Sequence, residues 1–113
     1  MANIYKNAFF DPADTANTVV YATDNLTRAI IQNIQVTNES GSKIVRAYVF
    51  DASNSNTAVQ VAYANITGPT ICNLAKGPII LEESDTLVLS SSDTTGISAT
   101  VSILEVNRGL IQQ

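Results

Sequence analysis

The chain has 113 residues, and its 6 Lys and Arg against 10 Asp and Glu give a formal charge of −4. It contains no histidine, no tryptophan and one cysteine. These absences exclude histidine-based triads and metal sites, an internal disulfide and a cysteine zinc cluster. The few cations are scattered along the chain, whereas nucleic-acid binding needs a basic surface. The length suits one domain with one core.

The apolar runs and the opening residues bear on where the protein is made. No run approaches the roughly 18 apolar residues that a bilayer span requires. Residues 1–6 lack the basic and apolar regions of a secretory signal. We therefore expect a chain that is made in a cytoplasm and has no membrane partner.

Residues 1–17 differ from the rest of the chain, because they combine apolar and aromatic side chains with the turn-like sequence Asp11-Pro12-Ala13-Asp14. The apolar members are Ile4, Tyr5, Phe9 and Phe10. One interpretation is a first strand that covers an end of the domain's own core. The other is an N-terminal arm whose four apolar side chains form an interface with a neighbouring subunit or a shell.

From residue 18 onward, apolar and polar residues alternate between turn sequences spaced about 8–12 residues apart, as in a sandwich or barrel. No long stretch keeps helical spacing, which argues against a parallel sheet with crossover helices. The expected strands are 18–23, 28–38, 43–51, 57–65, 70–75, 78–82, 85–91 and 97–106. The pattern predicts an all-β protein: one antiparallel β-sandwich of jelly-roll or Ig-like type over 18–106, followed by a tail at 107–113.

Three of these segments predict which way their side chains face. In 97–106, apolar residues alternate strictly with serine and threonine, as in an antiparallel strand with one solvated face. Segment 86–90 alternates in the same way, with Leu87 and Leu89 inward, and is the expected hairpin partner. Segment 43–50 is largely apolar on both faces, which predicts a central strand or one that lies under a partner chain.

The acidic residues offer two candidate sites, and both favour a structural interpretation. Glu82, Glu83 and Asp85 form a cluster, but adjacent residues on a strand point to opposite faces, so a charged turn is expected rather than a glycosidase pair. Segment 51–57 has oxygen-bearing side chains at alternate positions, as a calcium loop does. However, its sixth position is Asn56 and not glycine, so a surface loop is expected.

The single cysteine, Cys72, lies in an apolar stretch with no cation nearer than Lys76. It is expected to be a small core residue rather than a reactive thiolate. No phosphate-binding glycine loop is present in the sequence. We therefore expect no catalytic residues, no metal and no cofactor.

The order of several motifs resembles the small β-sandwich virion proteins of tailed bacteriophages over residues 18–106. The motifs are Val19-Val20-Tyr21-Ala22, the strand that ends in Thr37-Asn38, Pro78-Ile79-Ile80-Leu81 followed by Asp85-Thr86-Leu87, and the closing strand. Two departures stand out. Ser84 occupies a turn position where glycine is usual in that family, and Ala22-Thr23-Asp24 replaces the usual Val-Pro-Ala.

The resemblance implies a non-enzymatic structural protein of the virion, with a capsid decoration or cement subunit as the first hypothesis. Such a subunit is expected to form a homo-oligomer, with a trimer as first choice, and to bind the major capsid protein. The first alternative keeps the fold but places the protein in the neck or tail. The second, from another class, is a carbohydrate-binding adhesin that uses Tyr48 and Tyr63, although the chain has no tryptophan for stacking on sugars.

Overall fold

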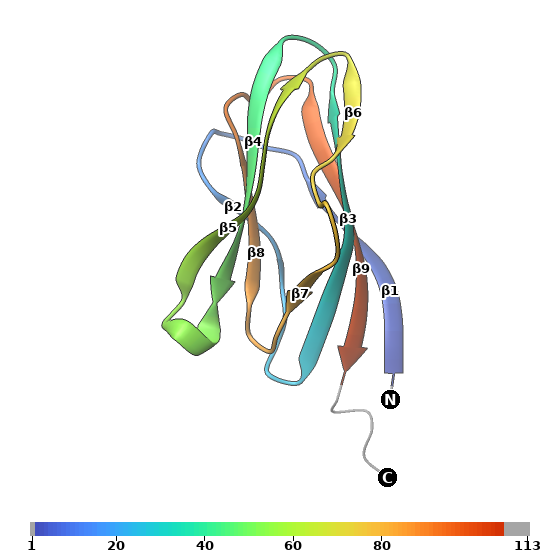
Figure 1. The fold of residues 1–113 in the computed structure, drawn as a ribbon, viewed down its shortest axis with the longest axis vertical. Coiled ribbons are helices and arrows are strands. Elements are labelled where there is room, and N and C mark those ends of the chain that lie inside the picture. The colour runs from blue at the N-terminus through green and yellow to red at the C-terminus, as the bar shows by residue number, and fades with distance from the viewer. Residues whose placement is uncertain (1, 108–113) are drawn as a thin grey trace.

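The computed structural model describes residues 2–107, and its regular structure is almost entirely strand (Figure 1). The strands are β1 (Ala2–Phe10), β2 (Thr18–Ala22), β3 (Thr27–Asn38), β4 (Ser42–Asp51), β5 (Thr57–Thr67), β6 (Thr70–Asn73), β7 (Ile79–Leu81), β8 (Thr86–Ser91) and β9 (Ile97–Asn107). A single turn of 3-10 helix, Ala52–Asn54, joins β4 to β5. Within the described range, no helix is long and apolar enough to cross a membrane.

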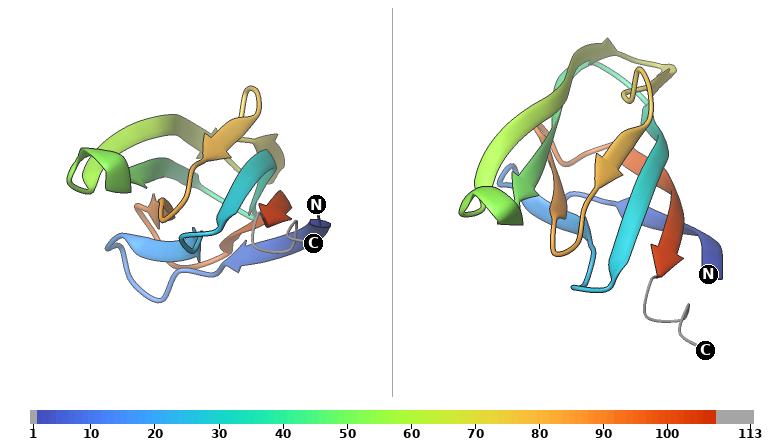
Figure 2. Two further views of the ribbon diagram at one scale, coloured as in Figure 1. Left: turned by 90° about the horizontal axis from the view of Figure 1, so that it is seen from below. Right: turned by 60° about the horizontal axis from the view of Figure 1, so that its bottom comes forward.

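The strands form two antiparallel sheets that pack face to face, as the view from below in Figure 2 (left) shows. One sheet has the order β1-β9-β3-β6, with β7 also paired to β3, and the other has the order β2-β8-β4-β5. The predicted antiparallel β-sandwich is therefore confirmed. Each of the eight segments predicted from residue 18 onward overlaps an observed strand.

The core lies between the sheets and is filled by alternate residues of their central strands. On β9, Ile97, Ala99, Val101 and Ile103 are buried, as their alternation predicted. On β4, Val45 and Ala47 are fully buried, and this strand lies between β5 and β8, which confirms the predicted central position. The largest fully buried apolar side chains are Phe10, Ile31, Ile34, Leu81, Leu87, Leu89 and Ile103.

The predicted hairpin between 86–90 and 97–106 is wrong. The first segment, β8, pairs with β2 and β4, whereas the second, β9, pairs with β1 and β3 in the opposite sheet. Leu87 and Leu89 do point inward, but they face β9 across the core instead of lying beside it. Two strands that line one core from opposite sheets have the same alternation as two hairpin strands, so periodicity alone does not separate these arrangements.

The N-terminal segment enters the same sandwich. β1 pairs with β9 from Ala2↔Asn107 to Phe10↔Ala99, and Phe10 is only 1% exposed. This geometry corresponds to the interpretation of residues 1–17 as a first strand that covers an end of the core. From residue 108 onward, the predicted tail lies outside the described residues.

A buried polar cluster closes the turn between β3 and β4. Lys43 is 5% exposed, and its ammonium donates to Oδ1 of Asn38 at 2.9 Å and to the carbonyl of Ser40 at 2.7 Å. The Asn38 amide donates to the carbonyls of Gly41 and Ile66, each at 2.9 Å. Because the two side chains satisfy one another, a lysine can occupy a core-facing position of β4.

Candidate functional site

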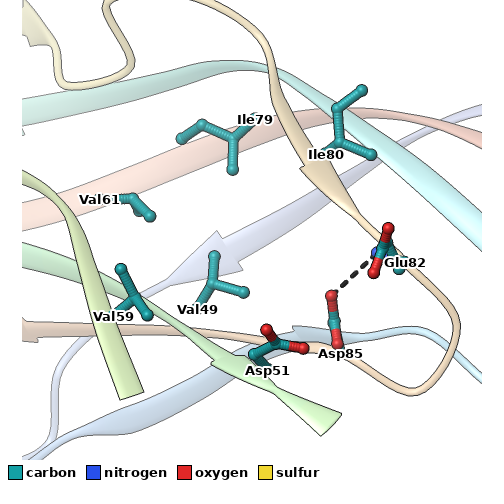
Figure 3. Close-up of a pocket in the computed structure, with 8 residues that line it drawn as sticks. All are labelled: Val49, Asp51, Val59, Val61, Ile79, Ile80, Glu82 and Asp85. Carbon is teal, nitrogen blue, oxygen red and sulfur yellow. Dashed lines mark hydrogen bonds between the residues drawn. The ribbon is translucent and has the colours of Figure 1, made fainter. Parts of the chain in front are cut away.

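A cleft of about 270 Å³ opens between the edge strand β5 and the short strand β7 (Figure 3). Its walls are apolar and come from Val49, Val59, Val61, Ile79 and Ile80. Three carboxylate side chains, Asp51, Glu82 and Asp85, lie at one end of it. The cleft therefore combines an apolar channel with an acidic end.

Register places these side chains in the cleft. Val59 lies opposite Val49, whose neighbours Val45 and Ala47 on the same face of β4 point into the core. Val61 lies at a register shift between Ala47 and Tyr48 of β4, which is the signature of a bulge. Val59 and Val61 are nevertheless 48% and 37% exposed, so these apolar side chains line an opening instead of a closed core.

Asp85 organises the turn between β7 and β8. It is buried, and its two carboxylate oxygens accept hydrogen bonds from the backbone N–H groups of Ala52 and Glu82, both at 3.0 Å. The Thr23 hydroxyl donates to the carbonyl of Glu82 at 2.7 Å and so ties the loop after β2 to the same turn. Both oxygens of Asp85 are thus used by the chain's own backbone.

Ser84 has a φ of 68°, in the left-handed region that glycine enters without steric cost. This is the turn position at which the resembled virion proteins usually carry glycine. A serine therefore occupies a turn position whose backbone conformation favours glycine.

The predicted acidic cluster is split by the fold. Glu83 pairs with Arg28 at 3.1 Å, while Glu82 lies at the cleft with Asp85. Asp51 joins them, and carboxylate oxygens of Asp51, Glu82 and Asp85 lie within 4.8 Å of one another. Sequence reasoning missed this grouping, because Asp51 belongs to another hairpin and no sequence spacing links it to Glu82.

The segment predicted as a surface loop, 51–57, connects β4 to β5. Asp51 caps its 3-10 turn by accepting from the N–H of Ser53 at 3.1 Å and from its hydroxyl at 2.6 Å. Ser55 and Asn56 have positive φ values and reverse the chain. Since Asp51 and Asp85 already accept hydrogen bonds from the chain, this cluster serves the two adjoining turns.

The four side chains predicted as an interface fall into two groups. Phe10 is part of the core, whereas Ile4, Tyr5 and Phe9 are 44%, 74% and 70% exposed on β1. Tyr5 and Phe9 point to the outer face of the sheet, since they alternate with the inward Phe10. Ile4 lies on the opposite face, that of Phe10, near the end of the strand. The edge strand β1 thus carries two exposed aromatic side chains, Tyr5 and Phe9, on its outer face.

Several exposed apolar residues were not singled out from the sequence. They include Val19, Leu26, Val59, Val61, Ile71 and Ile80. Most lie on strands at or near sheet edges, where an apolar residue of an alternating pattern is not covered by a neighbour. Only the strand order would have identified these residues as exposed, and the alternation of apolar and polar residues does not determine the strand order.

The structure also places the two tyrosines considered for sugar stacking, Tyr48 and Tyr63, and the single cysteine, Cys72. Tyr63 is half exposed on the outer face of the four-stranded sheet, with the Arg46 guanidinium 5.2 Å from its ring centre, and Tyr48 is partly buried. Arginine thus occupies one face of the more exposed ring, which leaves a poor stacking platform for a sugar. Cys72, on β6, packs partly buried against the core.

Comparison with known proteins identifies fold relatives and no family: no protein-family model and no curated protein sequence matches the chain. A chain from the structure of infectious bursal disease virus Gx strain superposes with a TM-score of 0.57 and 15% identity, over 96% of this chain and 31% of that one. For the Gt strain, the TM-score is 0.53 with 13% identity, over 96% and 32%. This chain thus spans about a third of those virus chains.

A chain from Bacillus endospore appendages, described as a novel family of disulfide-linked pili, superposes with a TM-score of 0.52 and 11% identity, over 91% of this chain and 85% of that one. At such identities, the likeness to the virus chains and to this one establishes the β-sandwich fold and nothing further.

Proposed function

We propose that this chain is a non-enzymatic structural subunit of a virus particle, and specifically a capsid decoration or cement subunit of a tailed bacteriophage. It would be made in the host cytoplasm and would reside in the virion. The observation that carries the proposal is the pair of exposed aromatic side chains, Tyr5 and Phe9, on the outer face of β1. Large exposed apolar side chains on a small domain mark a protein–protein contact more often than a reaction centre.

The geometry of the acidic cleft supports a non-enzymatic role. A general acid or base needs a carboxyl group with a free oxygen beside a substrate, and both oxygens of Asp85 are held by backbone N–H groups. Glu83 forms an ion pair with Arg28 and does not line the cleft. The sandwich fold, shared in part with chains of virus particles, agrees with assembly as the task.

The proposed partners are further copies of the chain, with a trimer as first choice, and the major capsid protein. Tyr5 and Phe9 form the contact with the shell, and Ile4, on the opposite face of β1, adds exposed apolar surface near the end of the strand. Phe10 holds β1 in the core and is not part of the contact surface.

Copy number in purified particles tests the proposal most directly. A decoration subunit should be present in numbers comparable to those of the major capsid protein, measured by quantitative gel analysis of the virus that encodes the chain. A small fraction of that number would place the subunit in the neck or tail, and its absence from the particle would overturn the virion role.

A binding assay tests the contact surface. The variant Tyr5→Ser/Phe9→Ser should lose co-sedimentation with undecorated shells, while the matched variant Ile71→Ser/Ile80→Ser, which removes exposed apolar groups on β6 and β7, away from β1, should keep it. Substitution is preferable to truncation, because removal of β1 would also remove Phe10 from the core. Unchanged binding by the β1 variant would refute this surface.

A further inference from the structure

The cleft between β5 and β7 has two parts of different chemistry. Valine and isoleucine side chains line most of it, and the carboxylates of Asp51, Glu82 and Asp85 lie at one end (Figure 3). Its volume of about 270 Å³ is below the roughly 300–1,000 Å³ of small-molecule sites. The cleft therefore has the size for one long side chain of another molecule and not for a whole cofactor or substrate.

The acidic end keeps hydrogen-bond acceptors that the chain itself does not use. Both oxygens of Asp85 and Oδ1 of Asp51 accept hydrogen bonds from backbone N–H groups. By contrast, Oδ2 of Asp51 and both carboxylate oxygens of Glu82 accept no hydrogen bond from residues 2–107. These three oxygens are available to a donor from outside.

No cation of the described residues neutralises this end of the cleft. No lysine or arginine lines it, and the ion pairs within residues 2–107 join Lys6 to Glu105 and Arg28 to Glu83. Oxygens of the three cleft carboxylates lie within 4.8 Å of one another, so like charges repel there and a bound cation would relieve the repulsion. The whole chain also has a formal charge of −4, which attracts a basic partner.

We propose that the cleft binds a lysine side chain presented by the basic surface of a partner protein. The apolar stem of the lysine would pack against Val59, Val61 and Ile79, because lysine buries its stem on apolar surface while its charge meets a polar group. The ammonium would donate to the free oxygens of Asp51 and Glu82. An ammonium has three N–H donors and no acceptor, which matches this set of oxygens.

The two parts of the cleft together select this occupant. A metal ion would use only the carboxylates, and an uncharged apolar segment would use only the walls. The acceptor oxygens come from separate carboxylates that approach one another. This arrangement suits the compact ammonium of lysine better than the planar guanidinium of arginine, which pairs best with both oxygens of a single carboxylate.

An NMR titration with Nα-acetyl-lysine N-methylamide measures binding of the side chain alone. The amide resonances of Val59, Val61 and Glu82 should shift together and saturate. The norleucine analogue lacks the ammonium, and methylammonium lacks the stem. Each should bind at least about ten-fold more weakly than the lysine probe, as expected for the loss of a charge-assisted hydrogen bond or of the buried stem.

Two adjacent glutamates provide matched variants. Glu82→Gln keeps the shape of the side chain and the backbone N–H that bonds to Asp85, but it removes the charge at the cleft. It should weaken binding of the lysine probe at least about ten-fold. Glu83→Gln removes the same charge one residue along, where the side chain pairs with Arg28 and does not line the cleft, and should leave binding unchanged.

Three results would overturn the proposal. The first is equal binding of the lysine probe by the two glutamine variants. The second is equal binding of the lysine probe and either truncated probe to the unmodified protein, and this comparison decides if circular dichroism shows that a variant does not fold. The third is binding of pentylammonium without binding of the peptide acetyl-Ala-Ala-Lys-Ala-Ala-amide, because the cleft would then accept a free amine and not a side chain carried by a protein.

This inference rests on the cleft and not on the virion assignment. The proposed shell contact lies on β1, whereas the cleft lies between β5 and β7, so the two partners are bound independently. If the lysine probe fails to bind while copy number in the particle is high, only the lysine site is lost. Absence of the chain from particles would remove the virion role and leave the lysine site standing.

Discussion

The buried pair of Asn38 and Lys43 provides the most quantitative test of how the sandwich is held together. The substitution Asn38→Ala removes two donors that satisfy the carbonyls of Gly41 and Ile66, and it removes an acceptor from the Lys43 ammonium. A neutral hydrogen bond contributes about 1 kcal/mol and one to a charged group about 1.5–3 kcal/mol. We therefore expect a loss of about 3–5 kcal/mol in the free energy of unfolding.

The matched substitution Lys43→Met should cost less. Methionine keeps the length and apolar stem of the side chain, but Oδ1 of Asn38 and the carbonyl of Ser40 lose the ammonium that donates to them, so we expect a loss of about 1–3 kcal/mol. The loss is smaller than for Asn38→Ala because that substitution leaves a buried charged group and two carbonyls with fewer partners.

Urea denaturation followed by circular dichroism measures both losses. For a domain of this size, 1 kcal/mol corresponds to about 4–8 °C in Tm, so Asn38→Ala should lower Tm by more than about 10 °C. If Lys43→Met destabilises the protein as much as Asn38→Ala does, the reasoning fails, because the hydrogen bonds of the ammonium would then hold the turn as strongly as those of the amide.

Two further predictions concern close packing and pH. A Cβ at Gly68 would lie 2.6 Å from the backbone nitrogen of Ser40, so Gly68→Ala should cost about 2 kcal/mol or more in the same denaturation assay, whereas Gly77→Ala meets no atom within 4 Å and should be close to neutral. Burial, together with the hydrogen bond that Tyr21 donates to Glu105, raises the pKa of the Tyr21 phenol well above its usual value near 10. Stability should therefore be complete below about pH 10 and fall as pH rises above it, by at most about 1.4 kcal/mol per pH unit, because only the unfolded phenol ionises there. Urea titrations across that range should show a shallower fall for Tyr21→Phe, and an equal fall would contradict the assignment.

Much of the fold could be predicted from local sequence, because the alternation of apolar and polar residues within a strand indicates which of its faces is buried. The alternation in 97–106 placed Ile97 and Ile103 in the core, and the apolar character of both faces of 43–50 placed that strand centrally. Strand order could not be obtained in this way. Whether β8 lies beside β9 or across the core from it depends on contacts between distant segments, and both arrangements bury Leu87 and Leu89 equally well.

The candidate site shows the same division. The acidic turn at 82–85 could be predicted as a turn, and Ser84 has the left-handed conformation that a turn glycine would adopt. The approach of Asp51 to Glu82 could not be predicted, since it arises where the end of β4 meets the β7–β8 turn. Lys43 illustrates the limit most clearly, because alternation places it on the core face and only the fold supplies its acceptors.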